Sequence, residues 1–116
     1  MDYNTYKWLN RLADHVVNNL SSDLLKKPHT NHCYVASEAF WHMTGKQFKP
    51  MFIRHEKSPH WFLMAGDGFV IDLTRSQFQT HPNYDSAKGK GFLTKQPSKR
   101  AQHLIDRIHK QQKEAR

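Results

Sequence analysis

The sequence predicts an α+β fold in which helices pack against a small antiparallel sheet. Three segments carry apolar residues at the spacing of three and four positions that is typical of amphipathic helices. Between the second and the third of them, the periodicity changes to short runs rich in aromatic and β-branched residues. Two of those runs are joined by Gly66-Asp67-Gly68, which predicts a hairpin and therefore antiparallel pairing.

Length and composition limit the kinds of protein to consider. At 116 residues the chain forms one domain, residues 1–116, with a single core to which 7 Phe, 4 Tyr and 3 Trp contribute. A formal net charge of +8 favours anionic partners. One cysteine excludes an intramolecular disulfide and fits a reducing compartment. Without an apolar run of membrane-spanning length or a signal-peptide pattern, the expected location is cytoplasmic.

The first helix is expected over residues 5–20, with Asn4 or Thr5 as its N-cap. Its apolar stripe is formed by Leu9, Leu12, Ala13, Val16, Val17 and Leu20. We expect residues 21–23 to break the pattern and Pro28 to end a short following turn, since proline lacks the N–H that a helix needs.

The second helix with its lead-in is expected over residues 29–45. Thr30 or Asn31 is a suitable N-cap, and Gly45 is a suitable residue just past the C-terminus. One stripe at helical spacing consists of Cys33, Ala36, Ala39, Phe40 and Met43. Cys33 is therefore placed in the first turn, on the face directed at the core or at a cleft beside it.

Three strands are expected at residues 51–55, 60–65 and 69–74. Residues 79–95 resemble a loop, with Phe92 and Leu93 as a short edge strand. A loop of that length in a small domain is usually functional or flexible.

The last helix is expected to begin after Ser98, which can cap it. Its apolar side carries Ala101, Leu104, Ile105 and Ile108, and its other faces are rich in lysine and arginine. The tail, Lys110–Arg116, is expected to fray.

Cys33 is the candidate nucleophile. A thiolate is the reactive form of cysteine, and the N–H groups and dipole of a helix N-terminus stabilise it. The alternative is a cysteine that only packs, because free cysteine is among the residue types most often buried.

His60 is the candidate base and Asp72 the group that orients it. If Gly66-Asp67-Gly68 is a three-residue loop, Phe62 lies opposite Asp72, and Phe62 shares a face with His60. The carboxylate then reaches the imidazole diagonally across the hairpin. A two-residue loop would place Asp72 on the opposite face. The alternative role for Asp72 is an ion pair with Arg54 or Arg75.

A cysteine at a helix start, a His-aromatic strand, and Gly-aromatic-x-x-Asp-x-Thr on the next strand resemble the transglutaminase-like branch of the papain-like superfamily. The matching stretches are Asn31–Phe40, His60–Met64 and Asp67–Thr74. The resemblance implies a small papain-like fold and a thiol-dependent acyl-transfer enzyme: a peptidase, isopeptidase, deamidase or acyltransferase acting on a protein or peptide without a cofactor or a metal. It assigns Cys33, His60 and Asp72 as nucleophile, base and orienting acid.

The sequence departs from the superfamily before the cysteine. Where papain-like proteases place an oxyanion-hole glutamine, this chain has residues 27–29, Lys-Pro-His. The backbone N–H of Cys33 together with Asn31 is the expected substitute. The chain also resembles uncharacterised small proteins encoded by bacteriophages, through Asn31–Phe40 and Gly91–Ala101, which implies host cytoplasm but no activity.

Three other functions stay open. A metal site would draw on His29, His32, Cys33 and a distant His55 or His81, although adjacent ligands are an awkward spacing for structural zinc. Nucleic-acid or acidic-partner binding would use the basic residues Lys88, Lys90, Lys95, Lys99, Arg100 and Arg107. The third is a protein-interaction module that keeps the fold without catalysis.

Overall fold

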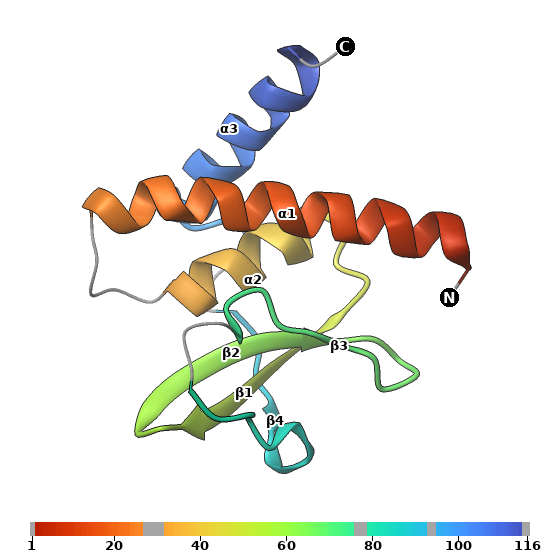
Figure 1. Ribbon diagram of the computed structural model, residues 1–116, viewed down its shortest axis with the longest axis vertical. Coiled ribbons are helices and arrows are strands. Elements are labelled where there is room, and N and C mark those ends of the chain that lie inside the picture. Colours follow the sequence, from red (N-terminus) through yellow and green to blue (C-terminus); the bar gives the residue numbers. More distant parts are fainter. Residues whose placement is uncertain (1, 27–31, 76–78, 93–94, 115–116) are drawn as a thin grey trace.

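The computed structural model shows three helices and a four-stranded antiparallel sheet, which confirms the α+β class (Figure 1). It describes residues 2–26, 32–75, 79–92 and 95–114. Along the chain the elements are α1 (Tyr3–Lys26), α2 (His32–Met43), β1 (Lys49–His55), β2 (Ser58–Met64), β3 (Val70–Ile71), η2 (Tyr84–Ser86), β4 (Lys88–Gly89) and α3 (Lys99–Glu114). In Figure 1, α2 lies between α1 and the sheet, and α3 packs against both α1 and α2 and extends past α1.

Helix α1 is longer than the sequence pattern predicted, because it continues through residues 21–23 to Lys26. Serine and aspartate lower helix propensity only slightly, and no glycine or proline interrupts this stretch. The expected N-cap was also wrong. Asp2 caps the helix instead, since its carboxylate accepts the backbone N–H of Thr5 at 2.9 Å and the Thr5 hydroxyl at 2.9 Å.

Helix α2 buries the predicted stripe. Cys33, Ala36, Ala39 and Phe40 are buried, and Met43 packs partly against the core. Gly45 follows the helix at a φ of +71°, as the expected C-terminal glycine does, and its N–H donates to the His42 carbonyl. The proposed N-caps Thr30 and Asn31 lie outside the described residues.

The sheet has the strand order β3-β2-β1-β4. Strands β1 and β2 form a hairpin in which Ile53 pairs with His60 and Phe52 with Trp61. Its two-residue turn places Glu56 at a φ of +49° and Lys57 at +65°, the backbone of a type I′ turn. Such turns normally carry Asn-Gly, so no sequence signal marked this one.

The β2–β3 connection has the three-residue loop that the sequence predicted. Leu63 pairs with Ile71, and the Ala65 N–H donates to the Phe69 carbonyl at 2.9 Å. Gly68 occupies the left-handed region at a φ of +89°. Strand β3 is shorter than the expected 69–74, so Asp72 lies just after the strand and not inside it.

The expected edge strand at Phe92 and Leu93 was misplaced. Leu93 lies outside the described residues, whereas Phe92 packs partly against the core outside any strand. The edge strand is β4, which pairs with β1 through Met51–Gly89 and Phe52–Lys88. This β4 pairing depends on distant backbone partners that local sequence does not reveal.

The sheet has an apolar cluster on each side. The larger cluster joins Leu63 and Ile71 to the three helices. The smaller one contains Met51, Ile53 and Phe62, with Tyr84 packed against it. The sheet is thus covered on both faces, by the helices on one and by the segment around η2 on the other.

Helix α3 buries the four predicted residues, Ala101, Leu104, Ile105 and Ile108, and Ser98 caps it by accepting the Ala101 N–H at 3.2 Å. The helix continues to Glu114, and the side chains of Gln111 and Asn19 exchange hydrogen bonds of 3.0 and 3.1 Å, whereas the expected fraying of Lys110–Arg116 stays a prediction. No helix within the described ranges combines the length and apolar character needed to cross a bilayer.

Candidate active site

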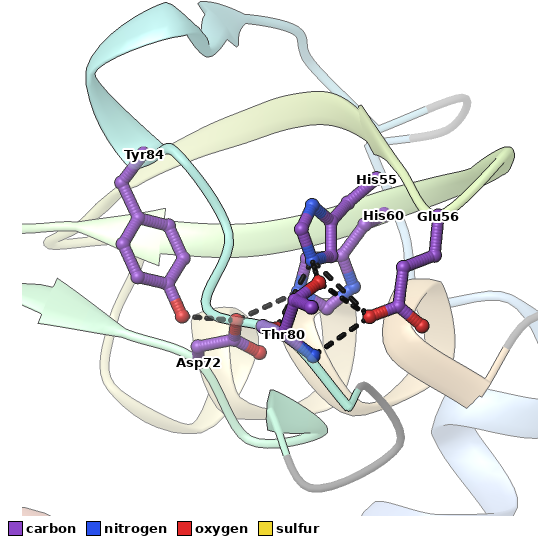
Figure 2. Close-up of polar contacts among 6 residues, drawn as sticks. All are labelled: His55, Glu56, His60, Asp72, Thr80 and Tyr84. Carbon is purple, nitrogen blue, oxygen red and sulfur yellow. Dashed lines mark hydrogen bonds and ion pairs between the residues drawn. The ribbon is translucent and has the colours of Figure 1, made fainter.

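His60 and Asp72 form a buried pair. The imidazole Nε2 lies 2.7 Å from Asp72 Oδ2, and the two side chains are 0% and 4% exposed (Figure 2). The backbone N–H of Thr74 donates to the other carboxylate oxygen at 3.3 Å. The loop parity that the sequence predicted therefore brings the acid to the histidine, and Asp72 makes its ion pair with His60.

Cys33 is placed by the docking of α2 along the edge of β2 that faces away from β1. Its Sγ lies 3.8 Å from the Pro59 carbonyl oxygen, and Ser37 Oγ donates to the Trp61 carbonyl at 3.3 Å. Four residues of helix rise about 6 Å, and two residues of strand rise about 6.8 Å. The rise from Cys33 to Ser37 on the helix thus nearly equals the rise from Pro59 to Trp61 on the strand, so both side chains can contact the same strand edge. The first turn of α2 therefore lies at the start of β2, next to His60.

The environment of His60 favours its charged form. Burial acts to lower its pKa, but hydrogen bonds and Coulomb attraction from Asp72 and Cys33 outweigh it and raise the pKa to about 9. Because Cys33 is among the groups that raise the pKa, its thiol lies near enough to the imidazole to act on the charge of His60. Since Nε2 is bonded to Asp72, the ring nitrogen suited to exchange a proton with Cys33 is Nδ1.

Tyr84 is a site residue that sequence reasoning missed. Its hydroxyl donates to Asp72 Oδ2 at 2.7 Å, so one carboxylate oxygen accepts both Tyr84 and His60 (Figure 2). Burial and the bond to Asp72 raise the pKa of Tyr84 far above its usual value. Its ring packs edge-on against Phe62 at 4.9 Å between centroids. Nothing in a loop-like stretch distinguishes such a tyrosine before the fold is known.

Figure 2 also shows a second polar network, formed by His55, Glu56 and Thr80. Glu56 accepts the backbone N–H of Thr80 at 2.8 Å and its hydroxyl at 2.6 Å, and these bonds lower the pKa of Glu56. His55 Nε2 lies 3.1 Å from the Thr80 carbonyl oxygen. The β1–β2 turn thus holds the segment that leads to Tyr84.

Those proposed metal ligands that the structure describes do not come together. Among the residues that the structure describes, no three histidine, cysteine or acidic side chains converge as a metal site. His55 is bonded to Thr80, and the His81 ring packs against Tyr84 at 5.3 Å between centroids. His29 lies outside the described residues, as does Asn31, the proposed oxyanion-hole partner.

The basic residues named from the sequence lie in two places. Lys88 is in β4, and the Lys90 ammonium lies 4.5 Å from the centroid of the Phe52 ring and 5.5 Å from that of Trp61. Lys95 precedes α3, which carries Lys99, Arg100 and Arg107. They form surface features on two separate elements.

Glu38 is a buried charge that the sequence did not single out. It is 0% exposed, and its carboxylate accepts the Ser98 N–H at 2.8 Å and the Ser98 hydroxyl at 2.7 Å. It fastens the start of α3 to α2, which is a structural role. Comparison of the chain with protein-family models, curated proteins and solved structures found no match.

Proposed function

We propose that the protein is a thiol-dependent acyl-transfer enzyme in which Cys33 is the nucleophile, His60 its proton partner and Asp72 the orienting acid. The observation that supports this most strongly is the position of His60. It is fully buried, is bonded to Asp72 through Nε2, and interacts with the Cys33 thiol. This is the chain of contacts that a cysteine nucleophile needs.

The proposal includes a resting charge state in which His60 is protonated and Cys33 is a thiolate. With a pKa of about 9, His60 carries a proton at neutral pH, and a cation beside a thiol favours the thiolate. Cys33 is the second residue of α2, so the N-terminal dipole adds to the same effect. Asp72 fixes the proton on Nε2, which leaves Nδ1 to face the sulfur.

The reaction has two steps. The Cys33 thiolate attacks a carbonyl carbon, and as the tetrahedral adduct collapses, His60 gives its Nδ1 proton to the leaving amine. A thioester on Cys33 remains. Water or an acceptor amine then attacks the thioester, His60 takes its proton, and the sulfur leaves as thiolate. Hydrolysis, deamidation, transglutamination and acyl transfer differ only in the leaving group and the acceptor.

The order of Cys33, His60 and Asp72 along the chain, with the helix docked beside an antiparallel sheet, supports a small papain-like, transglutaminase-like fold. We propose the Cys33 backbone N–H as one oxyanion donor. A protein or peptide in the cytoplasm, or in the host cytoplasm if a bacteriophage encodes the chain, is the proposed substrate. The basic residues of β4 and α3 are suited to steer an acidic one.

The test is acylation by p-nitrophenyl acetate, followed by release of nitrophenolate and by mass spectrometry of the intact chain. We expect one acetyl group on Cys33, absent from Cys33→Ala and formed on the order of tenfold more slowly in His60→Gln at pH 7, since the thiol loses the imidazolium that favours its thiolate. His55→Gln is the matched control and should react at the wild-type rate. Equal rates in His60→Gln and the wild type would refute the proposal.

A second candidate is a nucleic-acid-binding or protein-interaction module on the same fold, without catalysis. It is favoured by the net charge of +8 and by the exposed lysines Lys88, Lys95 and Lys99. Binding of an arbitrary duplex at several salt concentrations tests the nucleic-acid form. Affinity that falls steeply with salt would support it, and no binding at low salt would exclude it.

A further inference from the structure

An apolar groove of about 180 Å³ lies between the first half of α1 and the segment from Phe69 to Leu73. Its apolar lining comes from Leu9, Ala13, Phe40, Val70, Ile71 and Leu73. Tyr6 and Phe69 stand at its rim, 45% and 44% exposed, with ring centroids 6.4 Å apart. Asp72 also lines the groove, so the groove adjoins the candidate active site.

The groove runs beside an open strand edge. Strand β3 is the last in the sheet, and the carbonyl of Phe69 points to β2, where it accepts the Ala65 N–H. Because backbone groups alternate along a strand, those of Val70 point away from the sheet, toward the groove. A strand edge of this kind binds extended polypeptide by adding one more strand, and adjacent pockets select its side chains.

The distance to the nucleophile sets which substrate residue reaches the groove. Phe40 follows Cys33 by seven residues on α2, a helical rise of about 10 Å. An extended chain rises about 3.3 Å per residue, so about three residues cover that distance. The side chain in the groove therefore belongs to a residue about three positions from the reacting carbonyl.

We propose that this groove is a specificity pocket for an apolar side chain of an extended polypeptide substrate, placed about three residues from the reacting carbonyl. This inference rests on the proposed function, because it assigns the polypeptide to the Cys33 centre. An acidic side chain is disfavoured because the lining is mostly apolar and offers a buried carboxylate no cationic partner among the residues that form it. A leucine-sized side chain that leaves water here gains on the order of tenfold to a hundredfold in affinity.

The experiment measures how fast peptidyl vinyl sulfones modify Cys33, the only cysteine in the chain. Two probes are compared, with leucine or aspartate at the third residue before the electrophile and alanine elsewhere. We expect the leucine probe to react at least tenfold faster. The variant Ala13→Leu fills the groove from α1 and should abolish that preference, whereas Asn18→Leu, exposed on the same helix, should retain it.

Iodoacetamide has no peptide side chain that could enter the groove, so its rate tests the activation of Cys33 independently of the groove. If iodoacetamide finds no activated thiol in the wild type, the proposed function is wrong. If the thiol is activated but the leucine preference is absent or survives in Ala13→Leu, only the groove assignment is overturned. Ala13→Leu should keep the wild-type iodoacetamide rate, which shows that it folds. Phe69→Ser, which changes only the exposed rim, should reduce the preference in the same direction.

A second copy of this chain is the competing occupant of the groove. Sedimentation of the wild type and of Ala13→Leu tests it. We expect both to be monomers at the concentrations of the kinetic assay. A wild-type dimer that Ala13→Leu dissociates, together with equal rates for the two probes, would overturn the peptide assignment.

Discussion

Replacement of Asp72 by asparagine is the most informative perturbation of the candidate site. The carboxylate holds His60 by a charge-assisted bond of 2.7 Å in a place where both side chains are almost inaccessible to water. The pKa of His60 is raised from 6.5 to about 9. At 1.36 kcal/mol per unit, that shift corresponds to up to about 3 kcal/mol of differential stabilisation of the imidazolium.

Asp72→Asn removes the negative charge but leaves the burial, which acts to lower the pKa of His60. We expect the pKa of His60 to fall by at least about 2 units, which reduces the ratio of imidazolium to imidazole at neutral pH about 100-fold. In the proposed mechanism, Cys33 then loses its neighbouring cation, and alkylation of Cys33 at pH 7 should slow.

The assay is a pH titration of the histidine side chains by long-range proton–nitrogen NMR. The chain has 9 histidines, so the His60 resonances are assigned from their absence in His60→Gln. Asp85→Asn is the control, because it makes the same charge change on an exposed residue of η2 and should leave the His60 pKa unchanged. A His60 pKa that stays near 9 in Asp72→Asn would refute the assigned role of the carboxylate.

Three further predictions concern stability. Because the folded pKa of His60 lies above 6.5, the stabilisation from its pair with Asp72 should be complete below about pH 6.5 and be lost as the pH rises toward 9. The test is urea unfolding of Cys33→Ala, in which no thiolate forms to offset this loss: its stability should fall by up to about 3 kcal/mol across the range, and much less when His60→Gln is added. Glu38→Gln should lower the free energy of unfolding in urea by about 1–3 kcal/mol, since the carboxylate that accepts two Ser98 bonds is lost. The losses in Glu38→Gln and Ser98→Ala should not add in the double variant, and strict additivity would contradict a direct pair. Gly68→Ala should lower the free energy of unfolding, measured by thermal unfolding, by about 1–2 kcal/mol because the φ of Gly68 is +89°. Gly66 has open space around it and no positive φ, so Gly66→Ala should lower it far less, and equal losses would count against the loop assignment.

The sequence was sufficient for features that depend on local spacing. The helical stripe on α2 predicted the buried position of Cys33, and the Gly66–Gly68 loop predicted that Asp72 meets His60. Both predictions follow from fixed periodicities, 3.6 residues in a helix and two in a strand. The position of α1's first residue was harder to predict, because capping by Asp2 depends on one side chain among several suitable ones.

Other features depend on contacts between distant parts of the chain and were not predictable. Tyr84 meets Asp72 through contacts between distant segments: β4 pairs with β1, and Glu56 and His55 hold Thr80, which precedes Tyr84. Glu38 meets Ser98 across 60 residues of sequence, and no local pattern distinguishes it from a solvent-exposed helix residue. The Glu56-Lys57 turn adopts a backbone that its residues disfavour, since pairing of the long strands on either side imposes it.

The most direct test of the account is the pH dependence of iodoacetamide alkylation of Cys33, measured by mass spectrometry on the wild-type chain. If Cys33 and His60 form a thiolate–imidazolium pair, the rate should already be high at pH 6 and should change little up to about pH 8. A rate that is negligible at pH 6 and rises with the titration of an ordinary thiol, near pH 8.5, would contradict the account and leave Cys33 as a packing residue.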